Sequence, residues 1–198
     1  MKKVISILLI SLLTLNSFVT ISFAKSNENI KIIEDSTSVS LDGVKPGDSI
    51  TVFEDHENNY KVVIDVLAVN SGVSHYDTGN SGWSSGTIPS GGVLKLYPHI
   101  EGVSGGHKEM GFFEYVEYKK GTSHIINADQ PVVETGFAIN IIEDPIVRVK
   151  NHTATTITAK ASMTWVSSSI ALGITCNNYL TSELNKTGQS KLSWKFQS

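Results

Sequence analysis

Residues 74–92, SHYDTGNSGWSSGTIPSGG, place His75, Asp77 and Ser81 close together in the chain. These are the residue types of a nucleophilic triad, in which a histidine takes the proton of the serine and an aspartate orients the histidine. Glycine and serine also fill the stretch, and both are common in loops because they suit turn conformations. The pattern therefore admits two interpretations, a nucleophilic site and a loop between two strands.

Chain order favours the loop. The segment Gly79–Trp83, GNSGW, is similar to the Gly-Asp-Ser-Gly-Gly segment around the nucleophile of trypsin-like proteases, but asparagine and tryptophan replace two of its residues. In those proteases the histidine and the aspartate precede the serine, within a complete β-barrel. The chain before Ser81 is too short for such a barrel. We therefore predict that Ser81 lies in a loop and is not a nucleophile.

The same region offers candidate metal ligands, His75, Asp77 and His99, because imidazole and carboxylate groups suit zinc. His107 and Glu109 could present two more ligands from one strand face. The spacing matches no catalytic metal motif, and exposed loop histidines explain the same residues. A metal site and a hydrolase built on His75, Asp77 and His99 are thus alternatives to a non-catalytic protein, which needs no cofactor.

Carboxylate pairs for glycoside hydrolysis cannot be assigned from the sequence. Glu114 and Glu117 are separated by an odd number of residues, so they face opposite sides of a regular strand. We expect both to be charges on an exposed face.

Three aromatic residues are candidate ligand contacts. Tyr76 and Trp83 lie in the Gly/Ser-rich stretch, and Tyr97 follows shortly after it. Flat rings displayed beside polar side chains suit the binding of sugars or peptides. Trp165 and Trp194 instead fit alternating apolar faces, which predicts that both are buried.

The N-terminus has the three parts of a secretory signal peptide. Lys2 and Lys3 form its charged start, Val4–Phe18 its apolar run, and residues 22–24, Ser-Phe-Ala, a small-x-small cleavage site. Cleavage removes two lysines and no acid, so the net charge of −3 becomes −3 − 2 = −5. Acids then outnumber scattered bases, which excludes nucleic-acid binding. We expect a secreted, extracellular protein that keeps no membrane anchor after cleavage of residues 1–24.

Beyond the leader the chain has an all-β pattern. Residues 25–37 are predicted to form a loose N-terminal arm or a first edge strand, and residues 38–198 a single-domain antiparallel β-sandwich. Short runs rich in Val, Ile, Thr and aromatic residues recur between Gly, Asn, Asp and Pro, at 49–53, 60–69, 93–98, 111–118 and 132–142.

The last third of the chain predicts three consecutive strands. Apolar residues alternate with polar ones over residues 156–165, over residues 170–176, where Ile170, Leu172, Ile174 and Cys176 share a face, and over residues 192–196. The first two runs could also form a hairpin of nearly membrane-spanning length. A membrane-inserting β-hairpin toxin is therefore a further alternative.

The segments 80–92, NSGWSSGTIPSGG, and 96–100, LYPHI, together with the pattern of residues 161–196, resemble small secreted β-rich proteins of Gram-positive bacteria that form uncharacterised families. The resemblance implies a bacterial extracellular protein and transfers no catalytic residues. The leading hypothesis is a secreted, non-catalytic β-sandwich that binds a cell-surface glycan or protein.

Overall fold

Eleven strands form the part of the chain that the computed structural model describes, residues 31–67, 93–102, 106–119, 122–150, 153–154 and 158–198. None of these residues lies in a helix long and apolar enough to cross a membrane. The strands are β1 (Ile32–Ser40), β2 (Ser49–Asp55), β3 (Tyr60–Leu67), β4 (Val93–Glu101), β5 (His107–Lys119), β6 (Thr122–Thr135), β7 (Ile139–Lys150), β8 (Thr153–Ala154), β9 (Ala159–Ser169), β10 (Thr175–Leu184) and β11 (Gln189–Gln197).

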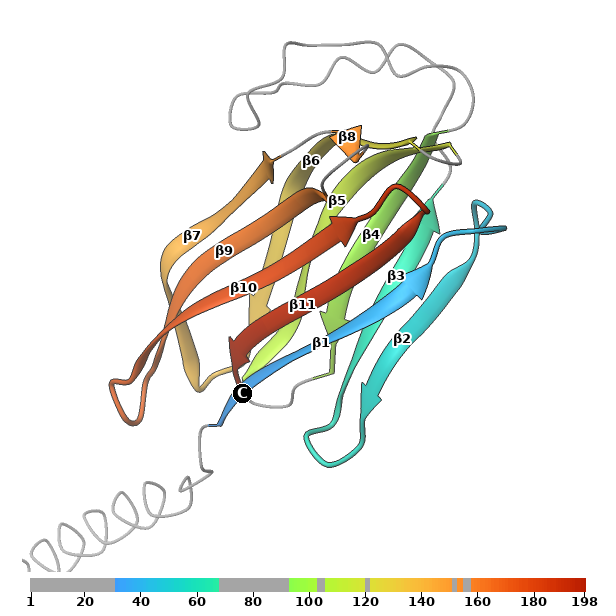
Figure 1. The fold of residues 1–198 in the computed structure, drawn as a ribbon. Coiled ribbons are helices and arrows are strands. Elements are labelled where there is room, and N and C mark those ends of the chain that lie inside the picture. The colour runs from blue at the N-terminus through green and yellow to red at the C-terminus, as the bar shows by residue number, and fades with distance from the viewer. Residues whose placement is uncertain (1–30, 68–92, 103–105, 120–121, 151–152, 155–157) are drawn as a thin grey trace, which may run out of the picture. The chain divides into compact units, whose positions relative to one another are not determined.

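The strands form two antiparallel sheets that face each other (Figure 1). One sheet has five strands in the order β1-β11-β10-β9-β7, and the other has six in the order β2-β3-β4-β5-β6-β8. Strands β2 to β6 are neighbours in chain order, as in a meander, and β9 to β11 repeat this arrangement. The predictions of an all-β fold and of two antiparallel sheets are confirmed.

The first strand of the described chain pairs with the last, β1 with β11. Ile32 to Ser40 pair without interruption with Gln197 to Gln189, so β1 forms one edge of the five-stranded sheet. Residues 32–37, for which the sequence allowed an arm or an edge strand, therefore belong to a strand that extends to Ser40.

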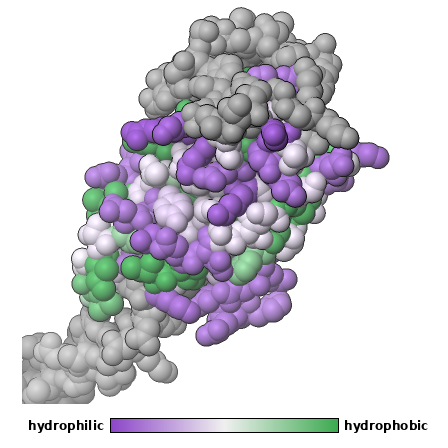
Figure 2. Space-filling model, in the orientation of Figure 1, coloured by the Kyte–Doolittle hydropathy of each residue, from purple (hydrophilic) through white to green (hydrophobic). Residues whose placement is uncertain are grey.

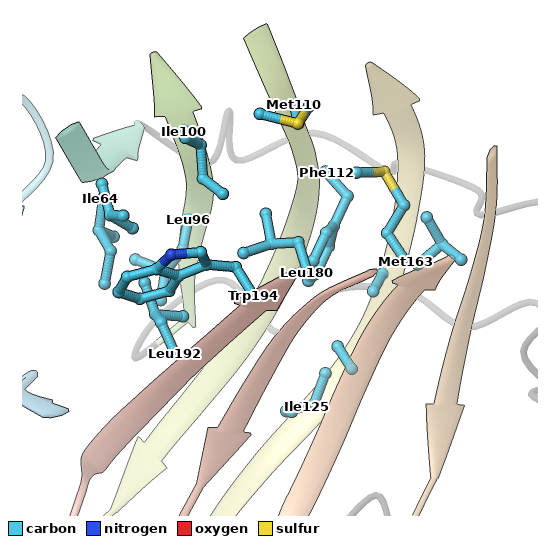
Figure 3. Close-up of a cluster of buried hydrophobic side chains, with 14 of the residues drawn as sticks. Ile64, Leu96, Ile100, Met110, Phe112, Ile125, Met163, Leu180, Leu192 and Trp194 are labelled. Atoms are coloured by element: carbon cyan, nitrogen blue, oxygen red, sulfur yellow. The ribbon is translucent and has the colours of Figure 1, made fainter. Parts of the chain in front are cut away.

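The core lies between the sheets, where side chains from both point toward one another (Figure 3). Alternation along β9 buries Ala159, Ala161, Met163 and Trp165, as predicted. On β11 the same alternation buries Leu192, Trp194 and Phe196. Trp194 packs against Phe53 and Tyr60 of the opposite sheet, at centroid distances of 5.3 and 6.4 Å.

The strand predicted at residues 170–176 is wrong for most of its length. β9 continues to Ser169, and serines take the place of apolar residues on its buried face at Ser167 and Ser169. Ile170, Leu172 and Ile174 then form the exposed β9–β10 turn and the approach to β10, while Cys176 is buried in β10. The predicted run 132–142 is likewise two strands, β6 and β7, separated by the turn at residues 136–138.

Two polar turns show how the sequence ends its strands. At the β2–β3 turn the Asp55 carboxylate accepts from the backbone N–H and the side-chain amide of Asn58, and these bonds lower the pKa of Asp55. At the β10–β11 turn Asn185 Oδ1 accepts from the backbone N–H groups of Thr187 and Gln189. The second turn confirms the break predicted between the last two strands.

Candidate functional site

The outward side of the six-stranded sheet carries charged and aromatic residues. Successive residues of a strand point to opposite sides, so the neighbours of core residues such as Leu96, Phe112 and Met110 point away from the core. We call this surface of β3 to β6 the acid–aromatic face. It consists of Lys61, Asp65, Lys95, Tyr97, His99, Glu101, Glu109, Phe113, Tyr115, Asp129 and Glu134.

Stacked rings occupy the middle of this face. The ring of Tyr97 stacks on the imidazole of His99 at a centroid distance of 4.5 Å and on the ring of Phe113 at 4.6 Å. The ammonium group of Lys95 lies 4.2 Å from the centroid of Phe113 and 5.4 Å from that of Tyr115. Such stacking and cation–π contacts hold the side chains in fixed positions.

Gly111 of β5 makes room for the stack. It lies opposite His99 in the β4–β5 ladder. A Cβ atom at this position would lie 2.6 Å from the Cβ of His99 and 2.7 Å from the ring of Tyr97. Residue 111 must therefore be glycine if both rings are to cross the sheet where they do.

Three glutamates lie side by side at the same end of this face. Glu101 of β4 is opposite Glu109 of β5, which is opposite Glu134 of β6. Like charges directly across a ladder repel one another, and neighbouring donors offset the repulsion here. Lys61 Nζ lies 2.9 Å from Glu101 Oε2, and the hydroxyl of Tyr97 donates to Glu109 Oε1 at 2.6 Å.

Burial and these hydrogen bonds also shift the pKa values of Glu101 and Tyr97. Burial tends to raise the pKa of Glu101, but hydrogen bonds from Lys61 and His99 outweigh burial, and the net pKa is lowered. Burial and the hydrogen bond to Glu109 both raise the pKa of Tyr97. The phenol of Tyr97 therefore stays neutral and keeps donating to the Glu109 carboxylate.

Both ring nitrogens of His99 have partners. Nδ1 lies 3.0 Å from the backbone carbonyl of Tyr97, and Nε2 lies 2.9 Å from Glu101 Oε1 and 4.0 Å from Asp65 Oδ2. A carbonyl and a carboxylate both accept hydrogen bonds, so each ring nitrogen of His99 faces an acceptor within the face.

Asp129 lies on β6, at one side of the acid–aromatic face. It lies opposite Phe113, and its Oδ2 accepts from the side-chain amide of Asn127 at 3.3 Å. Its Oδ1 is buried without a hydrogen-bond partner. Burial raises the pKa of Asp129, and the charge of Lys95 opposes that shift.

Two of the residues singled out from the sequence meet on this face. Tyr97 and His99 lie two residues apart on β4 and stack on each other, although only 9% of Tyr97 and 4% of His99 is exposed. The remaining candidates, His75, Tyr76, Asp77, Ser81 and Trp83, lie outside the described residues. Within the described ranges no group of three His, Cys, Asp or Glu side chains could hold a metal ion.

The expectation that His107 and Glu109 share a face is wrong. A register shift in the β5–β6 ladder between them turns the two side chains to opposite sides. His107 is buried in the core, where its Nε2 accepts from Trp165 Nε1 at 3.0 Å and its Nδ1 lies 2.6 Å from the carbonyl of Gln197. Burial lowers the pKa of His107, against the opposing effect of the Gln197 contact.

The expectation that Glu114 lies on an exposed face is also wrong, because Glu114 is buried in the core. Ser182 donates to its Oε1 at 2.9 Å, while its Oε2 has no hydrogen-bond partner. Burial raises the pKa of Glu114 to about 7, and the Ser182 bond only partly opposes this shift. The signal was present in the sequence, since Glu114 alternates in phase with the apolar Phe112 and Val116.

Comparison of the chain with protein-family models, with curated proteins and with solved structures finds no match. The resemblance to small secreted proteins of Gram-positive bacteria therefore stays a prediction. The functional argument consequently depends on the fold and on the chemistry of the acid–aromatic face.

Proposed function

We propose that the protein is a secreted, non-catalytic binding module that contacts its ligand through the acid–aromatic face. The observation that carries the proposal is the combination of stacked rings with a row of three carboxylates on the side of the sheet that faces away from the core. The sandwich needs neither feature for its hydrophobic core. Lys61 and Tyr97 offset the repulsion at Glu101 and Glu109, and a ligand that supplies hydrogen-bond donors would further stabilise the row at the exposed Glu134.

The chemistry of this face favours a ligand rich in hydroxyl or amine donors. Carboxylates accept hydrogen bonds from both groups, and the partly exposed ring of Phe113 supplies apolar contact beside them. A cell-surface glycan or a protein segment with exposed amines fits this description. A nucleic acid does not, because its phosphates would meet Glu101, Glu109 and Glu134.

Secretion is part of the proposal and is supported by the three-part leader in residues 1–24. Tyr76 and Trp83 stay predictions as further ligand contacts. A hydrolase built on His75, Asp77 and His99 has less support, because both nitrogens of His99 already have partners.

Binding to intact Gram-positive cells tests the proposal. The double variant Glu109→Gln/Glu134→Gln keeps the side-chain volumes and removes two charges from the row. We expect its binding to cells to weaken at least tenfold, as when interface groups that carry binding energy are removed. The matched control is Glu183→Gln on the five-stranded sheet, where Glu183 pairs with Lys160 at 2.9 Å. Equal binding by the double variant and the wild type would contradict the proposal.

A further inference from the structure

Hydrophobic side chains gather at one corner of the sandwich. Figure 2 looks onto the five-stranded sheet and shows them at the lower left, where Figure 1 places the β9–β10 turn. Phe137, in the β6–β7 turn, is 80% exposed, and Ile170, Leu172 and Ile174 follow β9 with about half of each side chain exposed. We call these four residues the apolar tip.

One hydrogen bond joins the two turns of the apolar tip. The backbone N–H of Ile170 donates to the carbonyl of Ala138 at 2.9 Å, and Ile139 pairs with Ser169 directly beside it. Phe137 is therefore held next to the β9–β10 turn. The four exposed apolar side chains thus lie on two turns that a backbone hydrogen bond holds side by side.

The hairpin that carries most of the apolar tip has no charged residues over most of its length. Residues 161–182, which span most of β9, the turn and most of β10, contain no Asp, Glu, Lys or Arg. Most outward residues of this hairpin carry hydroxyl or amide groups, such as Ser162, Thr181 and Asn177, and Val166 is an exception. The nearest charges along β7 are acidic, at Glu143 and Asp144.

Three backbone N–H groups of the β9–β10 turn donate to partners within the protein. Besides the Ile170 N–H, the N–H of Gly173 donates to the carbonyl of Ser169 at 2.9 Å, and the N–H of Leu172 donates to the hydroxyl of Ser169 at 3.1 Å. These internal bonds are compatible with entry into a hydrocarbon layer, where unpaired N–H groups are costly.

We propose that the apolar tip inserts into the interfacial layer of an electrically neutral lipid bilayer. The exposed apolar turns suit the acyl chains of a bilayer. The hydroxyl and amide groups beside them suit the lipid headgroups. The acids on β7 favour zwitterionic lipid over anionic lipid. A second copy of the chain is a less suitable occupant, because an exposed apolar area on the order of 400 Å² is about half of what each partner buries in a stable complex.

The insertion is shallow and does not span the membrane. The inward side chains of the hairpin, including Met163, Trp165 and Leu180, are buried against the six-stranded sheet. Membrane association through the apolar tip leaves this packing intact. It is independent of ligand binding by the acid–aromatic face, which lies on the other sheet.

Flotation with phosphatidylcholine vesicles tests the proposal, with the full-length chain expressed and recovered from culture medium. The variant Phe137→Ser/Leu172→Ser changes two exposed side chains, and the control Ile146→Ser changes an exposed isoleucine in mid-strand on β7. We expect wild type and control to float with the vesicles and the fraction of double variant bound to fall at least fivefold. All three proteins share the same N-terminal segment, so the comparison isolates the apolar tip.

Three results would overturn the proposal. The first is failure of the wild type to float, and the second is equal flotation by the double variant. The third is a wild-type dimer in sedimentation velocity that the double variant loses, which would assign the apolar tip to a second copy. Release of a trapped dye from the vesicles would contradict shallow insertion.

Discussion

The two faces of the six-stranded sheet use the same strands for opposite chemistry. On β5, Phe112 is fully buried against the other sheet, while its neighbour Phe113 stacks on Tyr97 on the outward side. Glu114 is buried in the core with one hydrogen-bond partner, and Glu109 lies outside in a row of carboxylates. One strand thus packs the core on one side and, under the proposed function, contributes to the ligand-binding surface on the other.

The two faces also accommodate acids in different ways. The inward face holds one carboxyl, Glu114, whose pKa rises to about 7 because burial disfavours its charged form. On the outward face, hydrogen bonds from Lys61 and His99 lower the pKa of Glu101, and the hydroxyl of Tyr97 donates to Glu109. Burial therefore dominates the titration of Glu114, and neighbouring donors dominate that of Glu101.

The largest expected effect is on the inward face. Phe112→Ala removes a fully buried ring and should lower the free energy of unfolding by about 3–5 kcal/mol. Urea denaturation followed by tryptophan fluorescence measures this loss. A loss below about 1 kcal/mol would mean that the core can collapse around the missing ring.

Glu114→Gln should remove a pH dependence of about 3 kcal/mol. The folded-state pKa of about 7 lies above the ordinary value of 4.5, so the wild type is most stable below pH 4.5 with respect to this group, and it loses stability as the pH rises through 7. Gln cannot ionise and keeps the volume. The free energy of unfolding of the wild type should decrease from pH 5 to pH 8. That of the variant should change less over the same range. Parallel pH profiles for the two proteins would show that Glu114 is not the group responsible.

Gly111→Ala should cost about 1–3 kcal/mol, the usual range for overpacking. The new methyl group would overlap the Cβ of His99 and the ring of Tyr97, so the stack must move. We expect the variant to lose binding to cells as well as stability. Normal binding with lowered stability would separate the ring stack from recognition.

The smallest expected effect on stability is that of Phe113→Ala. This ring is only partly buried, and its stacking with Tyr97 contributes about 1 kcal/mol. Its thermal melt should stay close to that of the wild type while cell binding weakens. The pair Phe112→Ala and Phe113→Ala thus tests the division between the two faces at adjacent positions.

The sequence predicts the fold well where alternation is strict. Every second residue of 159–165 and of 192–196 is buried, as the period of two indicates, because a strand in a two-sheet structure buries one side. It fails at residues 170–174, where apolar residues continue the alternation into a turn that buries nothing. Alternation alone does not show whether a partner sheet covers the face.

The candidate site was only partly predictable. Tyr97 and His99 were singled out as single residues, but their stacking depends on Gly111, which lies on another strand. The row Glu101, Glu109 and Glu134 depends on the registers of two ladders, and a register shift in β5 turns His107 inward. Pairing registers are tertiary information, so spacing along the chain could not reveal which side chains meet.

The most direct test of the central claim is a map of backbone amide chemical shifts on addition of solubilised Gram-positive cell-wall fragments. If the acid–aromatic face is the contact surface, the shifts of Tyr97, His99, Glu109 and Phe113 should change, and those of Ser162 and Thr181 on the five-stranded sheet should not. Changes confined to the five-stranded sheet, or no changes with fragments of cells that bind the protein, would contradict the account.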